Sequence, residues 1–220
     1  MIGALPPSSY VDQATPAVST AYEQAGWGKR VFDIAFATLV TLFVLTWLIP
    51  VIGLLIRLSS PGPVLFIQLR TGRNGRQFRC LKFRTMRHDL KAEFKQATSN
   101  DPRVTRIGRF LRKTNLDEMP QFINVLLGDM SVVGPRPHAI QHDAQYWHAI
   151  PGYAHRYSIK PGITGLAQTR GCRGETSALR DMMHRVRLDH FYIRKQNPIL
   201  DIKICWWTVA KVFEGDNKAF

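Results

Sequence analysis

The chain has 220 residues, of which 45% are hydrophobic, and it carries 30 Lys and Arg against 16 Asp and Glu, a formal net charge of +14. This length suits one domain, or one domain with an appendage, and the positive excess indicates an anionic partner such as nucleic acid, acidic lipid headgroups or phosphorylated small molecules. Cys80, Cys172 and Cys205 form no CxxC pair and no zinc spacing, which argues against a disulfide framework and favours a reducing compartment.

The first part of the chain divides into an extension and a long apolar run. Residues 1–28 lack both a basic segment and a helical period, and we expect a loosely ordered, flexible extension there. From Ile34 to Ile56 there are 23 residues without a charge. That is long enough for a transmembrane helix.

Two features of this run argue against a plain membrane span. Pro50 lies inside it, and a residue without a backbone N–H is expected to kink or break a helix. Basic residues flank both ends, with Lys29 and Arg30 before and Arg57 after, and positive charge favours the cytoplasmic side. We therefore predict that residues 29–58 form a re-entrant membrane helix broken at Pro50, with a kinked spanning helix as the alternative.

The following residues predict an α+β domain that is mainly helical. Val64–Leu69 and Phe78–Met86 are rich in strand-forming residues, and the Asn74-Gly75 pair between them is a strong hairpin signal. From Asp101 onward the pattern is mainly helical. The expected fold is thus a small β-hairpin within a helical domain.

Two later segments combine charge with an apolar stripe. Over residues 103–113, arginines recur every third residue around apolar side chains. Over Ile202–Phe213, two adjacent tryptophans lie beside lysines. Both patterns fit interfacial amphipathic helices in a headgroup layer, and both also fit a soluble domain with a solvated charged face or a core helix.

Asp117 and Glu118 are adjacent carboxylates in a basic region. Asn115 followed three residues later by Glu118 fits an N-cap arrangement, and Pro120 suits a helix start, so Glu118 could simply cap a helix. Asp117 would then lie in the first turn, where unpaired N–H groups favour an ionised carboxylate. An ionised Asp beside arginines can ligate Mg²⁺ or attack phosphorus.

Three basic residues are candidate phosphate ligands. Arg136 lies between two prolines on a rigid loop, which suits bidentate phosphate recognition. Lys82 and Arg84 alternate along one face of the second predicted strand, where they would face a common anion or simply be solvated. His138 and His142 have the i, i+4 spacing of a metal pair, but no third ligand follows a known zinc pattern, so we predict no zinc site.

These motifs resemble those of the bacterial sugar transferases, the monotopic polyprenyl-phosphate sugar-1-phosphate transferases (phosphoglycosyl transferases). The similarity covers all of the chain except the N-terminal extension. Several linked motifs in one order are more specific than any single motif. The matching segments are Lys29–Ile34, Ser60–Val64, Lys82–Met86, Asp101–Gly108, Asp117–Glu118, Val133–Pro137, Lys160–Gln168 and Asp201–Ile204.

The resemblance implies a re-entrant helix that anchors a cytoplasmic catalytic domain, residues 59–220, in the lipid of the bacterial inner membrane. It implies transfer of a sugar 1-phosphate from a UDP-sugar donor to a polyprenyl phosphate acceptor such as undecaprenyl phosphate, with release of UMP. Such chemistry would begin the repeat unit of an exopolysaccharide or capsule.

The resemblance also implies residue roles. Asp117 would be the nucleophile that forms a covalent phosphosugar intermediate, and Glu118 would assist it, with both carboxylates at a Mg²⁺ site. Lys82, Arg112 and Arg136 would bind phosphates. Cations at these positions would offset the repulsion between a carboxylate and a diphosphate.

The donor sugar is suggested by one loop. Gly171–Thr176 resembles the branch of the family that starts with glucose, which predicts glucose 1-phosphate as the transferred group. That branch usually has an aromatic residue at the position of Cys172 and Asn at the position of Arg170. Both departures lie beside Arg173, a candidate substrate ligand in the predicted donor loop. UDP-galactose or an N-acetylated aminosugar is therefore the alternative donor.

A competing hypothesis is a membrane-tethered protein that binds acidic lipid or nucleic acid without catalysis. It predicts that Asp117 is dispensable and that binding falls steeply with salt. A pure anion binder gains nothing from two carboxylates among its arginines, so we expect an enzyme with no nucleic-acid partner. The sequence leaves open whether the chain forms a homo-oligomer.

Overall fold

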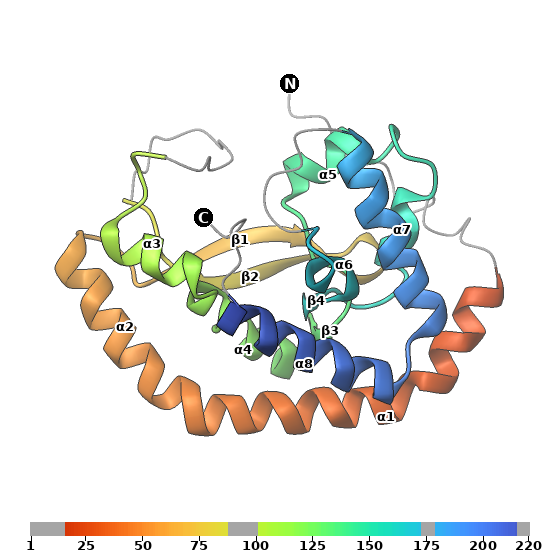
Figure 1. Ribbon diagram of the computed structural model, residues 1–220, viewed down its shortest axis with the longest axis horizontal. Coiled ribbons are helices and arrows are strands. Elements are labelled where there is room, and N and C mark those ends of the chain that lie inside the picture. The colour runs from red at the N-terminus through yellow and green to blue at the C-terminus, as the bar shows by residue number, and fades with distance from the viewer. Residues whose placement is uncertain (1–15, 88–100, 173–178, 215–220) are drawn as a thin grey trace.

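The computed structural model describes residues 16–87, 101–172 and 179–214. A long helical run forms an arc along one side of the molecule, and the other elements lie on its concave side (Figure 1). The run consists of α1 (Pro16–Val40), the π turn η2 (Thr41–Leu45) and α2 (Thr46–Ser59). Within the described part of the chain, one helix, Trp27–Ser59, is long and apolar enough to cross a membrane.

Helix α1 begins inside the stretch that we expected to be loosely ordered. It starts at Pro16, so the structure differs from that expectation over residues 16–28. Proline suits the first position of a helix, and residues added to the end of an existing helix need no new nucleation. The residues before Pro16 lie outside the described part.

Pro50 lies within α2, and the helix does not end there. Because proline lacks an N–H, the carbonyl of Thr46 loses its helical donor. The hydroxyl of Thr46 also donates to the carbonyl of Leu42, 2.6 Å away in the π turn. Prolines, π turns and such hydroxyl contacts bend helices without stopping them. The predicted break at Pro50 is therefore corrected to a bend within a continuous arc (Figure 1).

The predicted hairpin is confirmed. Strands β1 (Leu65–Thr71) and β2 (Gln77–Phe83) are antiparallel, with Leu65 opposite Phe83. The turn between them contains Asn74 at φ 56°, a left-handed conformation that Asn adopts more readily than most residues. The Asn-Gly signal therefore marks the place where the chain reverses.

Helix α4 (Gln121–Leu127) covers the free edge of β2. The Asn124 side chain accepts from the Leu81 N–H at 3.0 Å and donates to the Arg79 carbonyl at 2.8 Å. These bonds satisfy backbone groups that would otherwise lie open at a sheet edge. They also fix α4, and the turn before it, against the strand that carries Lys82.

The rest of the chain is mainly helical, as predicted. Helix α3 begins at Arg106, after Thr105 accepts from the Gly108 N–H at 2.9 Å as its N-cap, so the basic helix is shorter than expected. Strands β3 and β4 form a short parallel pair. The remaining elements are α3 (Arg106–Lys113), η4 (Leu116–Glu118), β3 (Ser131–Val133), α5 (Ile140–Tyr146), η5 (Tyr153–Tyr157), β4 (Gly162–Thr164), α6 (Leu166–Thr169), α7 (Leu179–Lys195) and α8 (Pro198–Glu214).

Buried charges join α1 to the domain. Asp33 is 2% exposed and accepts from the Ser131 hydroxyl and the Val132 N–H, both at 3.0 Å. Lys29 lies between this carboxylate, at 3.3 Å, and that of Asp201 on α8, at 2.9 Å. A buried carboxylate with several donors and a cation is well satisfied. The start of the apolar helix is thus held firmly against β3 and α8.

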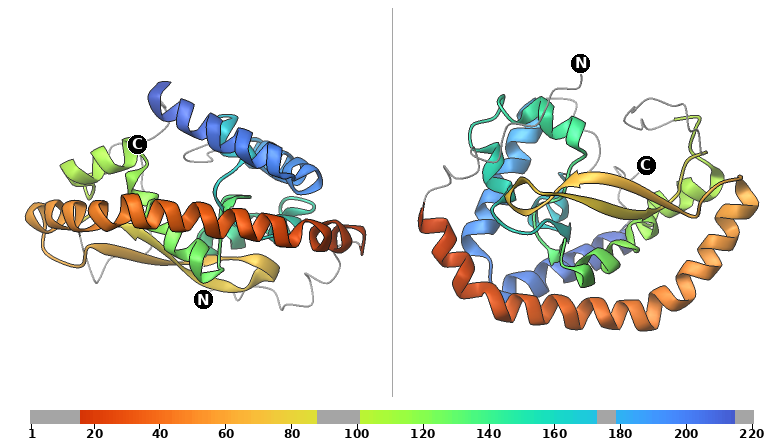
Figure 2. Two further views of the ribbon diagram at one scale, coloured as in Figure 1. Left: turned by 90° about the horizontal axis from the view of Figure 1, so that it is seen from below. Right: turned by 180° about the vertical axis from the view of Figure 1, so that it is seen from behind.

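The outer face of the arc is apolar and exposed. Phe43, Trp47 and Leu58 are each more than 70% exposed, and Trp206 on α8 is 70% exposed. Seen from below, α8 and the hairpin lie on opposite sides of the α1–α2 helix (Figure 2). Extended apolar surface of this kind marks an interface with lipid or protein.

Candidate active site

The carboxylate pair lies in a short 3-10 turn between two helices. Asn115, at φ 58°, reverses the chain after α3, and η4 then carries Asp117 and Glu118. The predicted N-cap is wrong, because the Asn115 side chain makes no capping bond and its carbonyl instead accepts from the Glu118 N–H at 3.3 Å. The left-handed backbone of Asn115 ends one helix rather than starting the next. Pro120 does stand at the start of α4, as expected.

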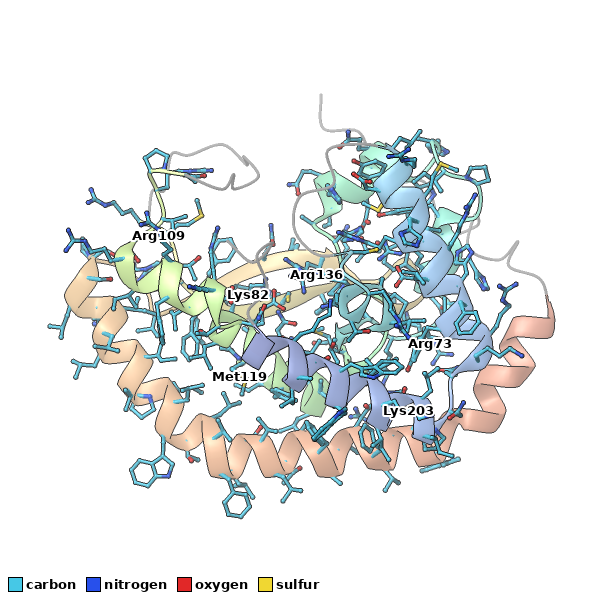
Figure 3. All side chains as sticks on the ribbon, in the orientation of Figure 1. Arg73, Lys82, Arg109, Met119, Arg136 and Lys203 are labelled. Carbon is cyan, nitrogen blue, oxygen red and sulfur yellow. The ribbon has the colours of Figure 1, made fainter. Side chains whose placement is uncertain are left out.

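Glu118 joins two cations from different elements. Lys82 Nζ on β2 lies 2.6 Å from Glu118 Oε1. Arg136 donates from Nη2 to Oε1 at 2.5 Å and from Nη1 to Oε2 at 2.9 Å, a bidentate pair. Burial opposes ionisation of Glu118, but the charges and hydrogen bonds of Arg136 and Lys82 outweigh it and hold its pKa well below the usual range. Lys82 and Arg136 lie close together at the centre of the molecule (Figure 3).

Asp117 has a different environment from its neighbour. It is 9% exposed, and among the described residues its carboxylate has no hydrogen-bond partner. Burial raises the pKa of Asp117 to about 6, in opposition to the nearby positive charge of Lys82, while the negative charge of Glu118 raises it further. Adjacent carboxyl groups whose pKa values are pushed apart can take separate chemical roles. Asp117 has the higher pKa of the two carboxyl groups, and the hydrogen bonds of Lys82 and Arg136 go to Glu118 instead.

Arg112 lies in the last turn of α3, shortly before the carboxylate pair. Its Nε donates to the Thr85 hydroxyl at 2.9 Å. Burial lowers the pKa of Arg112, and the negative charge of Asp117 acts in the opposite direction, so the two groups are electrostatic neighbours. The structure therefore brings together Asp117, Glu118, Lys82, Arg112 and Arg136.

Two other candidate ligands are not part of this group. Arg84 donates to the carbonyls of Ser60 and Pro61, both at 2.7 Å, and so holds the loop that follows α2. Lys82 and Arg84 therefore have different partners, because Lys82 contacts Glu118 and Arg84, which follows the last residue of β2, contacts this loop. Arg173 lies outside the described residues.

A buried polar cluster behind Arg136 was missed by the sequence reasoning. His138, weighed above only as a possible metal ligand, has its Nδ1 2.7 Å from the Tyr153 hydroxyl. Arg156 donates to the Arg136 carbonyl at 2.9 Å, and Arg70 donates to the Pro137 carbonyl at 2.6 Å. Single arginines without a spacing pattern gave no signal that they would meet here. Within the described ranges, no group of three or more His, Cys, Asp and Glu could hold a metal ion.

Comparison with known proteins decides the family. The family model described as bacterial sugar transferase matches residues 24–215. The chain belongs to the bacterial sugar transferase family. The resemblance inferred from linked motifs is therefore confirmed.

Individual relatives of this bacterial sugar transferase share about half of its residues. The UDP-glucose:undecaprenyl-phosphate glucose-1-phosphate transferase of Escherichia coli (strain K12) is 52% identical over 192 residues, which cover 87% of this chain and 41% of that protein. A protein of the same name from Caulobacter vibrioides is 48% identical over 86% of this chain and 71% of its own length. The exopolysaccharide production protein PSS of Rhizobium leguminosarum is 47% identical over 83% of this chain and 93% of its own length. The chain thus spans about two fifths of the Escherichia coli relative.

Proposed function

We propose that this chain transfers glucose 1-phosphate from UDP-glucose to undecaprenyl phosphate, with release of UMP. The observation that carries the proposal is the pairing of a buried Asp117, which has no hydrogen-bond partner among the described residues, with a Glu118 that holds Lys82 and Arg136. The names of the relatives support the donor and acceptor. A lipid product of this kind would begin an exopolysaccharide repeat unit.

The proposed reaction has two displacement steps at one phosphorus. A carboxylate oxygen of Asp117 attacks the β-phosphorus of the donor, and the bond to the bridging oxygen breaks so that UMP leaves with the electron pair. A phosphate oxygen of the polyprenyl acceptor then attacks the same phosphorus, and the Asp117 carboxylate is released. Covalent catalysis lets one site serve a soluble donor and a lipid acceptor in turn.

The cations around Asp117 lower the cost of bringing a carboxylate to a diphosphate. Arg136 offers a planar fork suited to phosphate oxygens, and Lys82 and Arg112 add positive charge on neighbouring elements. In the structure Glu118 keeps Arg136 and Lys82 within 3 Å of one carboxylate. The site is therefore organised before any donor binds.

The carboxylate pair also fits a Mg²⁺ ion. This ion usually takes one or two carboxylates, with substrate phosphates and water completing its coordination. Asp117 has free oxygens for this role, and Glu118 lies next to it in sequence. When bound, Mg²⁺ would neutralise charge on the donor diphosphate.

UMP release from a panel of UDP-sugars tests the proposal. Purified protein with Mg²⁺ and undecaprenyl phosphate is expected to release UMP from UDP-glucose in a lipid-dependent way. UDP-galactose and UDP-N-acetylated aminosugars should give slower release, although Cys172 and Arg170 depart from the glucose pattern. Release from only another donor would change the sugar and keep the mechanism. No release from any donor by folded protein would contradict the proposal.

The first step should depend on pH through Asp117. Because its pKa is raised to about 6, the nucleophilic carboxylate form is lost as pH falls below 6 and is complete above about 7. Rapid-quench measurement of the first UMP released, without lipid acceptor, should show a rate that falls about tenfold per pH unit below 6. Without the lipid acceptor, titration of the acceptor's phosphate cannot contribute to the pH profile. Circular dichroism confirms that the fold persists across this pH range. A rate independent of pH between 5 and 7 would argue against Asp117 as the ionising nucleophile.

We further propose that the α1–α2 helix is re-entrant in the bacterial inner membrane, with the domain on the cytoplasmic side. Both ends of the arc turn toward the domain, and its outer face is apolar (Figure 1). The outward Trp206 of α8 would lie at headgroup depth. The basic residues at both ends agree with this placement.

Cysteine labelling tests this topology. Ala25→Cys and Pro63→Cys, each made without the native cysteines, should resist a membrane-impermeant maleimide in intact cells and react after permeabilisation. The physical reason is that both ends face the cytoplasm. A spanning helix would instead expose one of the two positions to the reagent in intact cells.

A further inference from the structure

The loop that carries Arg136 is held from behind by a buried guanidinium. Arg156, in η5, has no exposed side-chain surface, and its Nη2 donates to the Arg136 carbonyl at 2.9 Å. Its Nε donates to Asp189 Oδ2 on α7 at 2.7 Å. The rings of Tyr153 and Tyr157 lie 5.1 and 5.8 Å from the centre of the same guanidinium. Arg156 therefore has little freedom to move.

A second arginine holds the next carbonyl of the loop. Arg70, at the end of β1, is 9% exposed and donates to the Pro137 carbonyl at 2.6 Å. Two successive carbonyls, those of Arg136 and Pro137, are thus bound by guanidinium groups from two different elements, η5 and β1. Gly134 packs so closely that an added Cβ would lie 2.7 Å from the Lys160 carbonyl oxygen. The backbone of this loop is fixed on several sides.

His138 extends the same support to α7. The Tyr153 hydroxyl donates to Asp143 Oδ1 at 2.8 Å and lies 2.7 Å from His138 Nδ1, and Arg156 Nη1 lies 3.1 Å from the same ring nitrogen. His138 Nε2 lies 3.2 Å from Arg185 Nη1 on α7. Burial, with the positive charge of Arg156, holds the pKa of His138 well below its usual range, so the ring is neutral and can accept.

Arg136 and Arg156 have different contacts and therefore different roles. Arg136 points at Glu118, whereas Arg156 contacts the Arg136 carbonyl, Asp189 and His138 and neither of the two carboxylates Asp117 and Glu118. A guanidinium can serve two acceptors at once with its planar fork, which an ammonium cannot do in the same geometry. In a buried environment such charge-assisted bonds are strong and directional.

We propose that Arg156, held by Asp189, is a positioning residue that aims the Arg136 guanidinium at Glu118 and at the donor diphosphate. Arg156 acts through the Arg136 carbonyl and does not itself meet the substrate. The inference rests on the proposed function for its kinetic consequence. Its structural consequence, the fixed pairing of Arg136 with Glu118, does not depend on the proposed function.

The test begins with Arg156→Lys, which can keep the charge pair with Asp189 but cannot also bind the Arg136 carbonyl. In full-length protein in nanodiscs, KM for UDP-glucose should rise about tenfold while kcat changes less, because a small displacement of a phosphate ligand weakens donor binding. Arg187→Lys, an exposed change on α7, the helix that carries Asp189, is the matched control and should leave KM unchanged. An unaltered KM in Arg156→Lys would overturn the proposal.

A double-mutant cycle separates positioning from general damage. If Arg156 works through Arg136, then Arg156→Lys should add no further loss to an Arg136→Lys protein. A merely structural role predicts that the two losses multiply, together with a matching loss of thermal stability, and that result would overturn the proposal.

A spectroscopic measurement that needs no turnover tests the positioning role of Arg156 independently of the proposed reaction. In protein labelled with ¹⁵N-arginine, the Nε–H signal of Arg136, assigned by its loss in Arg136→Lys, should shift in Glu118→Gln and in Arg156→Lys but not in Arg187→Lys. An unchanged signal in Arg156→Lys would refute positioning. A shifted signal in a protein whose wild type releases no UMP would uphold positioning and refute the proposed reaction.

Discussion

Replacement of Asp117 by Asn is expected to reduce UMP release from UDP-glucose by roughly a thousandfold or more, the size of loss seen when a nucleophile is removed. An amide cannot form the acyl-phosphate bond, although it fills nearly the same volume. In wild-type protein incubated with donor alone and quenched in acid, intact-mass analysis should show a sugar-phosphate adduct, and peptide mapping should place it on Asp117. The Asn variant should show no adduct.

The control for this experiment is Asp181→Asn, an exposed carboxylate on α7 outside the site. It should retain wild-type release and the adduct. Full turnover by Asp117→Asn, without hydrolysis of the amide back to Asp, would remove Asp117 from the nucleophile role. An adduct on another residue would do the same.

The hairpin shows what local sequence can predict. The Asn74-Gly75 pair defines a turn by its backbone preference alone, and the flanking strands have the expected composition. Lys82 then lies at a position set by strand register, opposite Phe66. Local rules therefore locate this cation, and family motifs locate Arg136, but neither shows that they meet at Glu118.

The errors arise where tertiary contacts decide. The sequence around Asn115 fits a capping pattern, yet the left-handed backbone there serves a tight reversal between α3 and α4. Arg84 follows the alternation of a strand that has already ended. Arg156 and Arg70 are distant in sequence from Arg136 and act on its loop through backbone carbonyls. Long-range contacts of this kind have no periodicity that one sequence can display.

The basic pair before the apolar helix has a structural use that charge counting does not predict. Lys29 bridges Asp33 and Asp201, and Arg30 donates to the carbonyls at the end of α4, with its Nη1 2.7 Å from the Val125 oxygen. Unpaired carbonyls at a helix C-terminus favour a cation. The same residues that indicate topology therefore also hold the apolar helix to the domain.

Replacement of Glu118 by Gln should have the opposite effect on stability from replacement of Asp117. Gln leaves Lys82 and Arg136 without their shared negative charge in a mostly buried place. Breaking such a pair lowers the free energy of unfolding by about 3 kcal/mol. This is the low end of the usual range, because the Arg136 side chain is 28% exposed. Asp117→Asn instead removes a buried carboxylate whose pKa is raised in the folded state. Its ionisation costs stability as pH rises from about 4 toward 6, so Asn should be neutral or stabilising by about 2 kcal/mol at pH 7.

Chemical denaturation of both variants in the same detergent distinguishes these cases. Glu118→Gln should also slow UMP release roughly a hundredfold, because Arg136 and Lys82 lose the group that orients them. Combining Glu118→Gln with Arg136→Gln should cost less than the sum of the single changes, since the second removes the charge that the first left unpaired. If Glu118→Gln were as stable as wild type, the ion pairs would contribute little to the fold. If Asp117→Asn were the less stable variant, the two carboxylates would have exchanged the structural and chemical roles assigned to them, because the carboxylate that attacks phosphorus should be the one that the fold does not need.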